Sequence, residues 1–145
     1  MTWMIETERE AAVAQAEMFR LYADPSTWPA WGHNATTARA DGPLVEGGTV
    51  HVRANYGKVY PCTIRRLVAD RLLVLEVRPP GLTVVQTYDL DQVPGGVRVR
   101  HMLEISGRLS GMLRIGGAPR LYQRLLDREV DKVIALAASR ERDPA

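Results

Sequence analysis

The fold class is decided by residues 82–106, which read LTVVQTYDLDQVPGGVRVRHMLEIS. Apolar and polar side chains alternate on both sides of the turn PGG, and this is the pattern of two half-buried strands joined by a hairpin. Comparable turn sequences (DGP, GG, NYG, AD and PPG) punctuate the preceding residues back to Thr36. The intervals between them are too short for crossover helices, so neighbouring strands should pair antiparallel. Residues 36–106 therefore predict six short strands in a meander.

Helical patterns flank this meander. Residues 1–8 alternate weakly as a strand, and Glu10–Tyr22 then places apolar side chains at helical spacing. An Asp-Pro-Ser sequence at residues 24–26 ends that helix, and a side-chain oxygen there can cap a short second helix through Trp28 and Trp31. The chain is thus predicted to begin with a strand followed by two helices.

A long amphipathic helix is predicted over the last 30 residues. Gly116-Gly117 should break any helix that begins at Leu109, and Pro119 suits the first turn of the long one. Most of the charged side chains lie on the face opposite the apolar one. The apolar face consists of Tyr122, Leu125, Leu126, Val130, Val133, Ile134 and Ala137. Because this face needs the sheet to cover it, the sequence predicts an α+β fold.

Composition limits the architecture and the compartment. The 145 residues are 46% apolar and 25% charged, which is typical of one ordinary domain. We assign this domain to residues 1–140 and expect a disordered tail at 141–145. The net charge of +2 gives no indication of nucleic-acid binding, and the single cysteine, Cys62, excludes an internal disulfide and fits a reducing compartment. An acidic N-terminus without a long apolar stretch predicts a cytoplasmic chain without integral membrane association, as a monomer or homodimer.

Strand alternation selects the side chains that face the covered side of the sheet. In the strand at 97–106 these are Val97, Val99, His101, Leu103 and Ile105. His101 is therefore the one polar member of an apolar series. Two roles stay open for it: a hydrogen bond to a nearby carbonyl or water, or ligand contact and proton transfer, because histidine titrates near neutrality.

The strand at residues 59–68 is predicted to turn an arginine inward. Alternation places Arg66 on the covered face with Tyr60, Cys62, Ile64 and Val68, unless a bulge at Pro61 shifts the register. A buried guanidinium needs hydrogen-bond partners, which a ligand carbonyl, enolate or carboxylate could supply as well as a protein carboxylate.

Two further strands complete the inward set. In residues 82–90 the inward side chains are Val84, Gln86, Tyr88 and Leu90. Tyr88 could orient a carbonyl or act as an acid, although a buried tyrosine can equally be a packing group with a satisfied hydroxyl. In residues 72–78 we favour Leu73, Leu75 and Val77 inward, because the opposite register would bury Glu76 and Arg78.

Three segments carry a resemblance to a known family: ADPSTWPAW at 23–31, GKVYPCTIRRLVAD at 57–70 and TYDLDQVPGGVRVRH at 87–101. With these segments in this order, nearly the whole chain resembles the START/polyketide-cyclase (SRPBCC) superfamily. The resemblance implies the helix-grip fold, a curved antiparallel sheet of about seven strands wrapped around a long C-terminal helix. It also implies a cavity between sheet and helix for a small apolar or aromatic molecule.

The resemblance leaves two classes of function open, because members include cyclases, aromatases, lipid carriers and hormone receptors. One is a cofactor-independent cyclase or aromatase in which Arg66, His101 or Tyr88 stabilises an enolate or moves a proton; similar cyclases place an arginine in the cavity at the position of Arg66. The other is a carrier or sensor of a lipid, polyketide or steroid-like ligand. Gly32, His33 and Ala35 depart from the larger residues of similar cyclases and would widen the cavity mouth. The predicted ligand-binding residues are Trp28, Trp31, Tyr60, Cys62, Ile64, Val84, Gln86, Val99, Leu103, Tyr122 and Leu126.

Other chemistries find less support. The three histidines lack metal-ligand spacing, and no glycine-rich phosphate-binding motif occurs. A nucleophilic Cys62 would need a neighbouring base. Seven arginines between residues 98 and 128, with Asp127, Glu129 and Asp131 interleaved, are interpreted as a solvated face. We therefore expect no metal, no cofactor and no nucleic acid.

Overall fold

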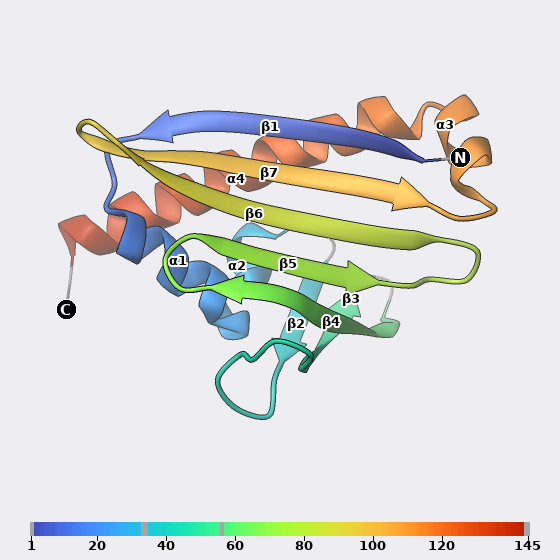
Figure 1. The fold of residues 1–145 in the computed structure, drawn as a ribbon, viewed down its shortest axis with the longest axis horizontal. Coiled ribbons are helices and arrows are strands. Elements are labelled where there is room, and N and C mark those ends of the chain that lie inside the picture. The colour runs from blue at the N-terminus through green and yellow to red at the C-terminus, as the bar shows by residue number, and fades with distance from the viewer. Residues whose placement is uncertain (1, 33–34, 56, 144–145) are drawn as a thin grey trace.

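The computed structural model describes residues 2–32, 35–55 and 57–143, so His33 and the last two residues of the predicted tail lie outside it. Figure 1 shows one curved sheet with a long helix running along one of its faces. The strands are β1 (Trp3–Ala11), β2 (Ala35–Arg39), β3 (Thr49–Ala54), β4 (Val59–Val68), β5 (Leu72–Val77), β6 (Thr83–Val93) and β7 (Gly96–Ser106). The helices are α1 (Gln15–Ala23), the 3₁₀ turn η1 (Pro25–Thr27), α2 (Trp28–Trp31), α3 (Ser110–Ile115) and α4 (Ala118–Arg142).

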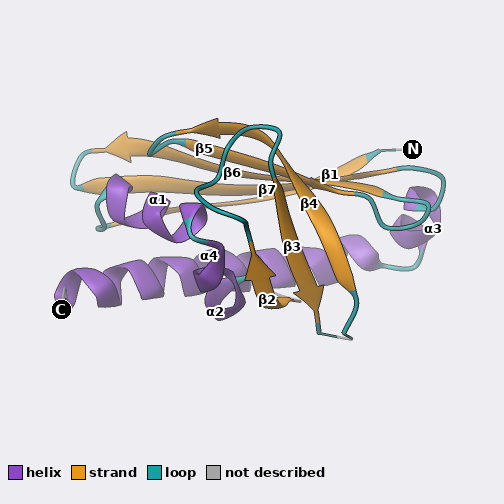
Figure 2. Cartoon of the chain, turned by 90° about the horizontal axis from the view of Figure 1, so that it is seen from below, coloured by secondary structure: helices purple, strands orange, loops and turns teal. Residues whose placement is uncertain are grey.

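The sheet is antiparallel throughout, in the order β1-β7-β6-β5-β4-β3-β2. The predicted meander of six strands is confirmed as β2 to β7, and β1 joins it beside β7. Figure 2 shows α4 along one face of the sheet, with β2, β3 and β4 turned toward the helix. This is the helix-grip architecture that the resemblance implied.

The first strand is longer than predicted, and the first helix begins later. β1 pairs with β7 as far as Ala11, and α1 begins at Gln15 rather than Glu10. Ion pairs from Arg98 to Glu8 and Glu10 lie across this strand pair on the outer face of the sheet. Cross-strand pairing therefore overrides the helical spacing of these residues.

A bulge in β4 makes the prediction of an inward Arg66 wrong. Ile64 pairs with Leu75 and Arg66 with Val74, so that Arg65 is an extra residue in the strand. Such a residue reverses the side-chain alternation beyond it. Arg66 and Val68, both predicted inward, are consequently exposed, while Leu67 packs against the core. The sequence alternative was a bulge at Pro61, and the observed bulge lies four residues further along the strand, at Arg65.

The other predicted inward faces are confirmed. Leu73 and Leu75 on β5 are buried, as are Leu90 on β6 and all five predicted members of β7. The apolar face of α4 packs against this surface through Leu126, Val130, Val133 and Ala137. α4 extends past the predicted boundary at residue 140 to Arg142, and Glu141 Oε1 accepts a hydrogen bond from the Ala14 N–H at 2.8 Å.

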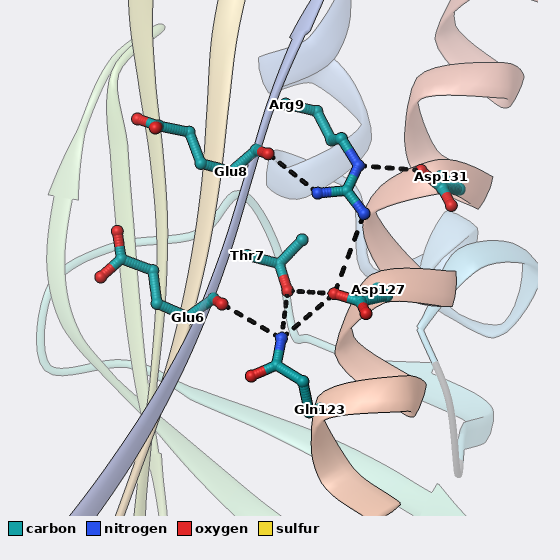
Figure 3. A network of polar contacts seen from close by, with 7 residues as sticks. All are labelled: Glu6, Thr7, Glu8, Arg9, Gln123, Asp127 and Asp131. Atoms are coloured by element: carbon teal, nitrogen blue, oxygen red, sulfur yellow. Dashed lines mark hydrogen bonds and ion pairs between the residues drawn. The ribbon is translucent and has the colours of Figure 1, made fainter. Parts of the chain in front are cut away.

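A polar network fixes α4 against the edge strand β1 (Figure 3). The Thr7 hydroxyl donates to Asp127 Oδ1 at 2.5 Å and accepts from Gln123 Nε2 at 2.8 Å. Arg9 adds ion pairs to Asp127 and Asp131 on the solvent side. These contacts fix the orientation of α4 about its own axis. In this orientation the apolar face of α4 packs against the sheet.

Candidate functional site

A cavity of about 280 Å³ lies between the sheet and α4. Its wall is mainly apolar, with a small number of polar groups, which is the usual character of a small-molecule site. The lining residues are Trp28, Trp31, Gly32, Ala35, Val52, Ala54, Tyr60, Cys62, Leu75, Val77, Pro79, Leu82, Val84, Gln86, Tyr88, Leu103, Ile105, Tyr122 and Glu129.

Most residues predicted for the site lie on this wall. They are Trp28, Trp31, Tyr60, Cys62, Val84, Gln86, Tyr88, Leu103 and Tyr122. Three predicted wall residues do not line the cavity, namely Ile64, Val99 and Leu126. Each is at most 3% exposed, because these three side chains are packed in the solid part of the core.

The two tryptophans present their apolar faces because their polar atoms are satisfied elsewhere. Asp24 accepts a hydrogen bond from the Ser26 N–H and starts the turn that carries them. Trp28 Nε1 donates to the Tyr22 carbonyl at 3.1 Å, and Trp31 Nε1 donates to Thr27 Oγ1 at 3.2 Å. Both indole rings can therefore serve as cavity wall without leaving an unpaired donor.

Gln86 and Tyr88 form the polar part of the wall on the sheet side. The Tyr88 hydroxyl donates to Gln86 Oε1 at 2.9 Å. Burial, followed by the nearby charge of Glu129, raises the pKa of Tyr88 well above its usual value, so the hydroxyl stays protonated at neutral pH. The Gln86 Nε2 group has no hydrogen-bond partner among the described residues. This pair thus offers the cavity one unused amide NH2 group, with two N–H donors.

Glu129 on α4 is a cavity residue that the sequence analysis missed. It was grouped with the solvated acids, yet it is 3% exposed and lines the cavity. Its position follows Leu126 by three residues and precedes Val133 by four, which is the spacing of the buried helix face. That spacing is the signal in the sequence that could have found it.

His101 supports Glu129 from behind the cavity wall. The ring is fully buried, and its Nδ1 lies 2.9 Å from Glu129 Oε1. Its Nε2 lies 2.7 Å from the hydroxyl of Tyr22 on α1. A neutral ring that donates its Nδ1–H to Glu129 can accept the Tyr22 hydroxyl at Nε2, and both neighbours are then satisfied. His101 does not line the cavity, so its direct contact with a ligand is not supported by this placement.

Aromatic rings enclose this buried chain of hydrogen bonds. Tyr88 and His101 are opposite each other on β6 and β7, and their ring centroids lie 4.7 Å apart. Tyr22 stacks on Tyr88 at 5.3 Å and meets Trp31 edge-on at the same distance. Burial, followed by the charge of Glu129, raises the pKa of Tyr22 well above its usual value. Tyr22 therefore remains a hydroxyl donor at neutral pH.

The Cys62 thiol and a metal site were the other chemical possibilities considered from the sequence. Burial raises the pKa of Cys62 from its usual value of 9.0 to about 11, so its thiol is almost entirely protonated at neutral pH. Within residues 2–32, 35–55 and 57–143, no three His, Cys, Asp or Glu side chains come together as a metal site would require. Among the described helices, none has the length and apolar character needed to cross a bilayer.

Comparison with known proteins places this arrangement in a family. Residues 2–138 match the family described as polyketide cyclase / dehydrase and lipid transport. The chain therefore belongs to the polyketide cyclase / dehydrase and lipid transport family. No curated protein matches the sequence at a significant level.

Solved structures with the same fold cover nearly the whole chain. A Mesorhizobium loti protein is 18% identical with a TM-score of 0.76, over 94% of this chain and 98% of that one. A Staphylococcus aureus protein of unknown function is 12% identical with a TM-score of 0.79, over 99% and 98%. A START-superfamily protein from Mycobacterium smegmatis is 10% identical with a TM-score of 0.73, over 94% and 97%. At these identities the likeness extends to the fold alone.

Proposed function

We propose that this protein binds a small, mostly apolar molecule with one hydrogen-bonding oxygen. The observation that carries the proposal is the cavity of about 280 Å³ between sheet and helix, with Gln86 as its unused donor. An engineered apolar cavity of about 150 Å³ accommodates benzene, so this cavity of nearly twice that volume has room for an aromatic molecule considerably larger than benzene. Apolar wall area would provide the affinity, and the Gln86 amide would orient a ligand carbonyl or hydroxyl.

Two neighbouring valines on β6 provide a matched test of the cavity. Val84 lines it, whereas Val85 points to the other face of the sheet. We expect Val84→Trp to weaken binding of N-phenyl-1-naphthylamine, measured by its fluorescence, by about tenfold or more, since the indole would occupy the space. Val85→Trp should leave the affinity within about twofold of the parent protein. Equal affinities for both variants would contradict binding at this cavity.

The natural ligand requires a separate measurement. Native mass spectrometry of freshly purified protein should detect a co-purified molecule of matching size. The Val84→Trp variant, purified in parallel, should lose that mass, and the Val85→Trp variant should retain it. A mass retained by all three proteins would place the bound molecule elsewhere.

A second candidate function is a cyclase- or aromatase-like reaction without a cofactor. It is favoured by Glu129, an acidic residue that lines the same cavity as Gln86 and Tyr88. Glu129 would take a proton from a carbon between two carbonyls, and the C–H electron pair would move onto a carbonyl oxygen as an enolate. The Gln86 amide would donate a hydrogen bond to that oxygen. Glu129 thus replaces the exposed Arg66 in this scheme, with His101 as its positioning residue.

This reaction is tested with a simple diketone. In D₂O, the protein should accelerate exchange of the α-hydrogens of 1-phenylbutane-1,3-dione, followed by NMR. Glu129→Gln should remove that acceleration while probe binding persists. Asp131→Asn, an exposed position on the same helix, is the matched control and should exchange like the parent. Unchanged exchange in Glu129→Gln would exclude Glu129 as the base and leave the binding proposal standing.

A further inference from the structure

Exposed apolar side chains are concentrated at one end of the molecule. Of the large apolar residues that are exposed in the described part of the chain, half lie within residues 109–121. Ile115 is 91% exposed and Met112 69% exposed, both on α3. Leu121, at the start of α4, is 57% exposed, and Leu109 is 37% exposed. A group of exposed apolar side chains in one segment is the usual mark of an interaction site.

The same segment is strongly basic. Residues 106–126 contain Arg108, Arg114, Arg120 and Arg124 but no aspartate or glutamate, and all four arginines are exposed. Within the described chain, Arg108, Arg120 and Arg124 form no ion pair. The acids that suggested a solvated face begin only at Asp127. We call these four arginines, with Leu109, Met112, Ile115 and Leu121, the α3 patch.

The α3 patch adjoins one end of the cavity. The Leu109 N–H donates to the Gly81 carbonyl at 3.0 Å, next to the cavity residue Leu82. Leu113 of α3 packs in the same apolar cluster as Ile105 and Tyr122, which line the cavity. Figures 1 and 2 show α3 at the end of the sheet away from the C-terminus.

We propose that the α3 patch docks the protein onto the surface of anionic lipid bilayers. Aliphatic side chains that project as far as Ile115 can enter the acyl region of a bilayer, which needs no complementary shape. The arginines around them would lie at the level of the anionic headgroups, whose surface potential attracts them. A second copy of the chain is a poorer occupant, because two patches of four arginines repel each other. The proposal rests on the surface alone and does not require an occupied cavity.

Vesicle sedimentation tests the docking directly. We expect the protein to sediment with vesicles of phosphatidylcholine and phosphatidylserine and to stay in solution with vesicles of phosphatidylcholine alone. Raising the salt concentration from 0.1 M to about 0.5 M should weaken the binding, because salt screens charges at an exposed surface. Failure to sediment with the anionic vesicles at low salt would overturn the proposal.

Two pairs of double variants separate the electrostatic contribution to vesicle binding from the apolar contribution. Arg120→Gln with Arg124→Gln should weaken vesicle binding by about thirtyfold, given the attraction expected for each basic residue. The matched control is Arg140→Gln with Arg142→Gln at the far end of α4, where the same loss of charge should have little effect. Both control arginines are exposed.

A second double variant, with its own control, tests the apolar contribution to vesicle binding. Met112→Ser with Ile115→Ser should abolish most of the binding at every salt concentration, because removal of the inserted side chains is not a charge effect. Val45→Ser with Val68→Ser, two exposed valines outside the patch, should bind vesicles like the parent. Vesicle binding that persists in both patch variants would overturn the proposal. So would concentration-dependent dimerisation that the patch variants abolish, since the face would then belong to a second copy.

Discussion

The buried pair of His101 and Glu129 should be strongly coupled, so that loss of either partner alone destabilises the fold. The side chains are 0% and 3% exposed, and the two atoms that join them are 2.9 Å apart. Removing one partner of such a pair costs about 3–5 kcal/mol, because the other keeps its polar group in the core. His101→Leu should therefore lower the free energy of unfolding by about that amount, a large share of the 5–15 kcal/mol typical of a domain.

The double variant shows whether the cost comes from the pair. When His101→Leu and Glu129→Leu are combined, no polar group is left behind, and the loss should be smaller than that of His101→Leu alone. Urea unfolding followed by the fluorescence of the buried tryptophans gives the free energies by linear extrapolation. The exposed pair of Arg98 and Glu10 is the control, and its disruption should cost about 1 kcal/mol or less. Additive losses at positions 101 and 129 would refute the coupling and the description of the polar wall built on it.

Three further outcomes follow from individual contacts. The free energy of unfolding should fall as pH rises from about 9 to about 11, because the pKa of Cys62 is 9.0 in the unfolded chain and about 11 in the folded one. In urea unfolding at pH 11, Cys62→Ala should remove about 2–3 kcal/mol of that loss. Gly96→Ala should unfold at a clearly lower temperature than Gly42→Ala, since its Cβ would lie 1.9 Å from the Ala11 carbonyl oxygen, while nothing lies within 4 Å of the Cβ at Gly42. Thr7→Val should cost about 1–2 kcal/mol in urea unfolding, because it breaks the hydrogen bonds between β1 and α4.

The sheet could be predicted because its signals are local. Alternation within β5, β6 and β7 identified the inward faces, and the short turns between them allowed only antiparallel pairing. The bulge in β4 could not be found in this way, since Arg65 and Arg66 are both polar and either one satisfies an outward position. Its register depends on pairing with β5, which is a property of two strands rather than of one.

The candidate site could be predicted only in part, for a related reason. The walls contributed by β6 and β7 follow from alternation, whereas the Tyr22 hydroxyl finds His101 only because the fold brings α1 against the sheet. Glu129 lies on the apolar face by its spacing, but its charge placed it with the solvated residues. A buried acid is rare without a partner, and the partner in this protein, His101, lies on another element.

The cavity wall contains Glu129 instead of the predicted Arg66, and this difference changes the class of ligand that the cavity should accept. No arginine or lysine is among the described residues of its wall, and the one carboxylate there is Glu129. A ligand carboxylate would be desolvated beside a like charge without a cation to compensate it, which is strongly unfavourable. A neutral alcohol with the same chain length loses far less hydration free energy on entering the cavity, and its hydroxyl can donate to Glu129 or accept from Gln86. At pH 8, 1-decanol should therefore displace N-phenyl-1-naphthylamine about tenfold more effectively than decanoate, and Glu129→Gln should narrow that difference. Equal displacement by the two compounds in the parent protein would show that the Glu129 charge does not act on the bound ligand.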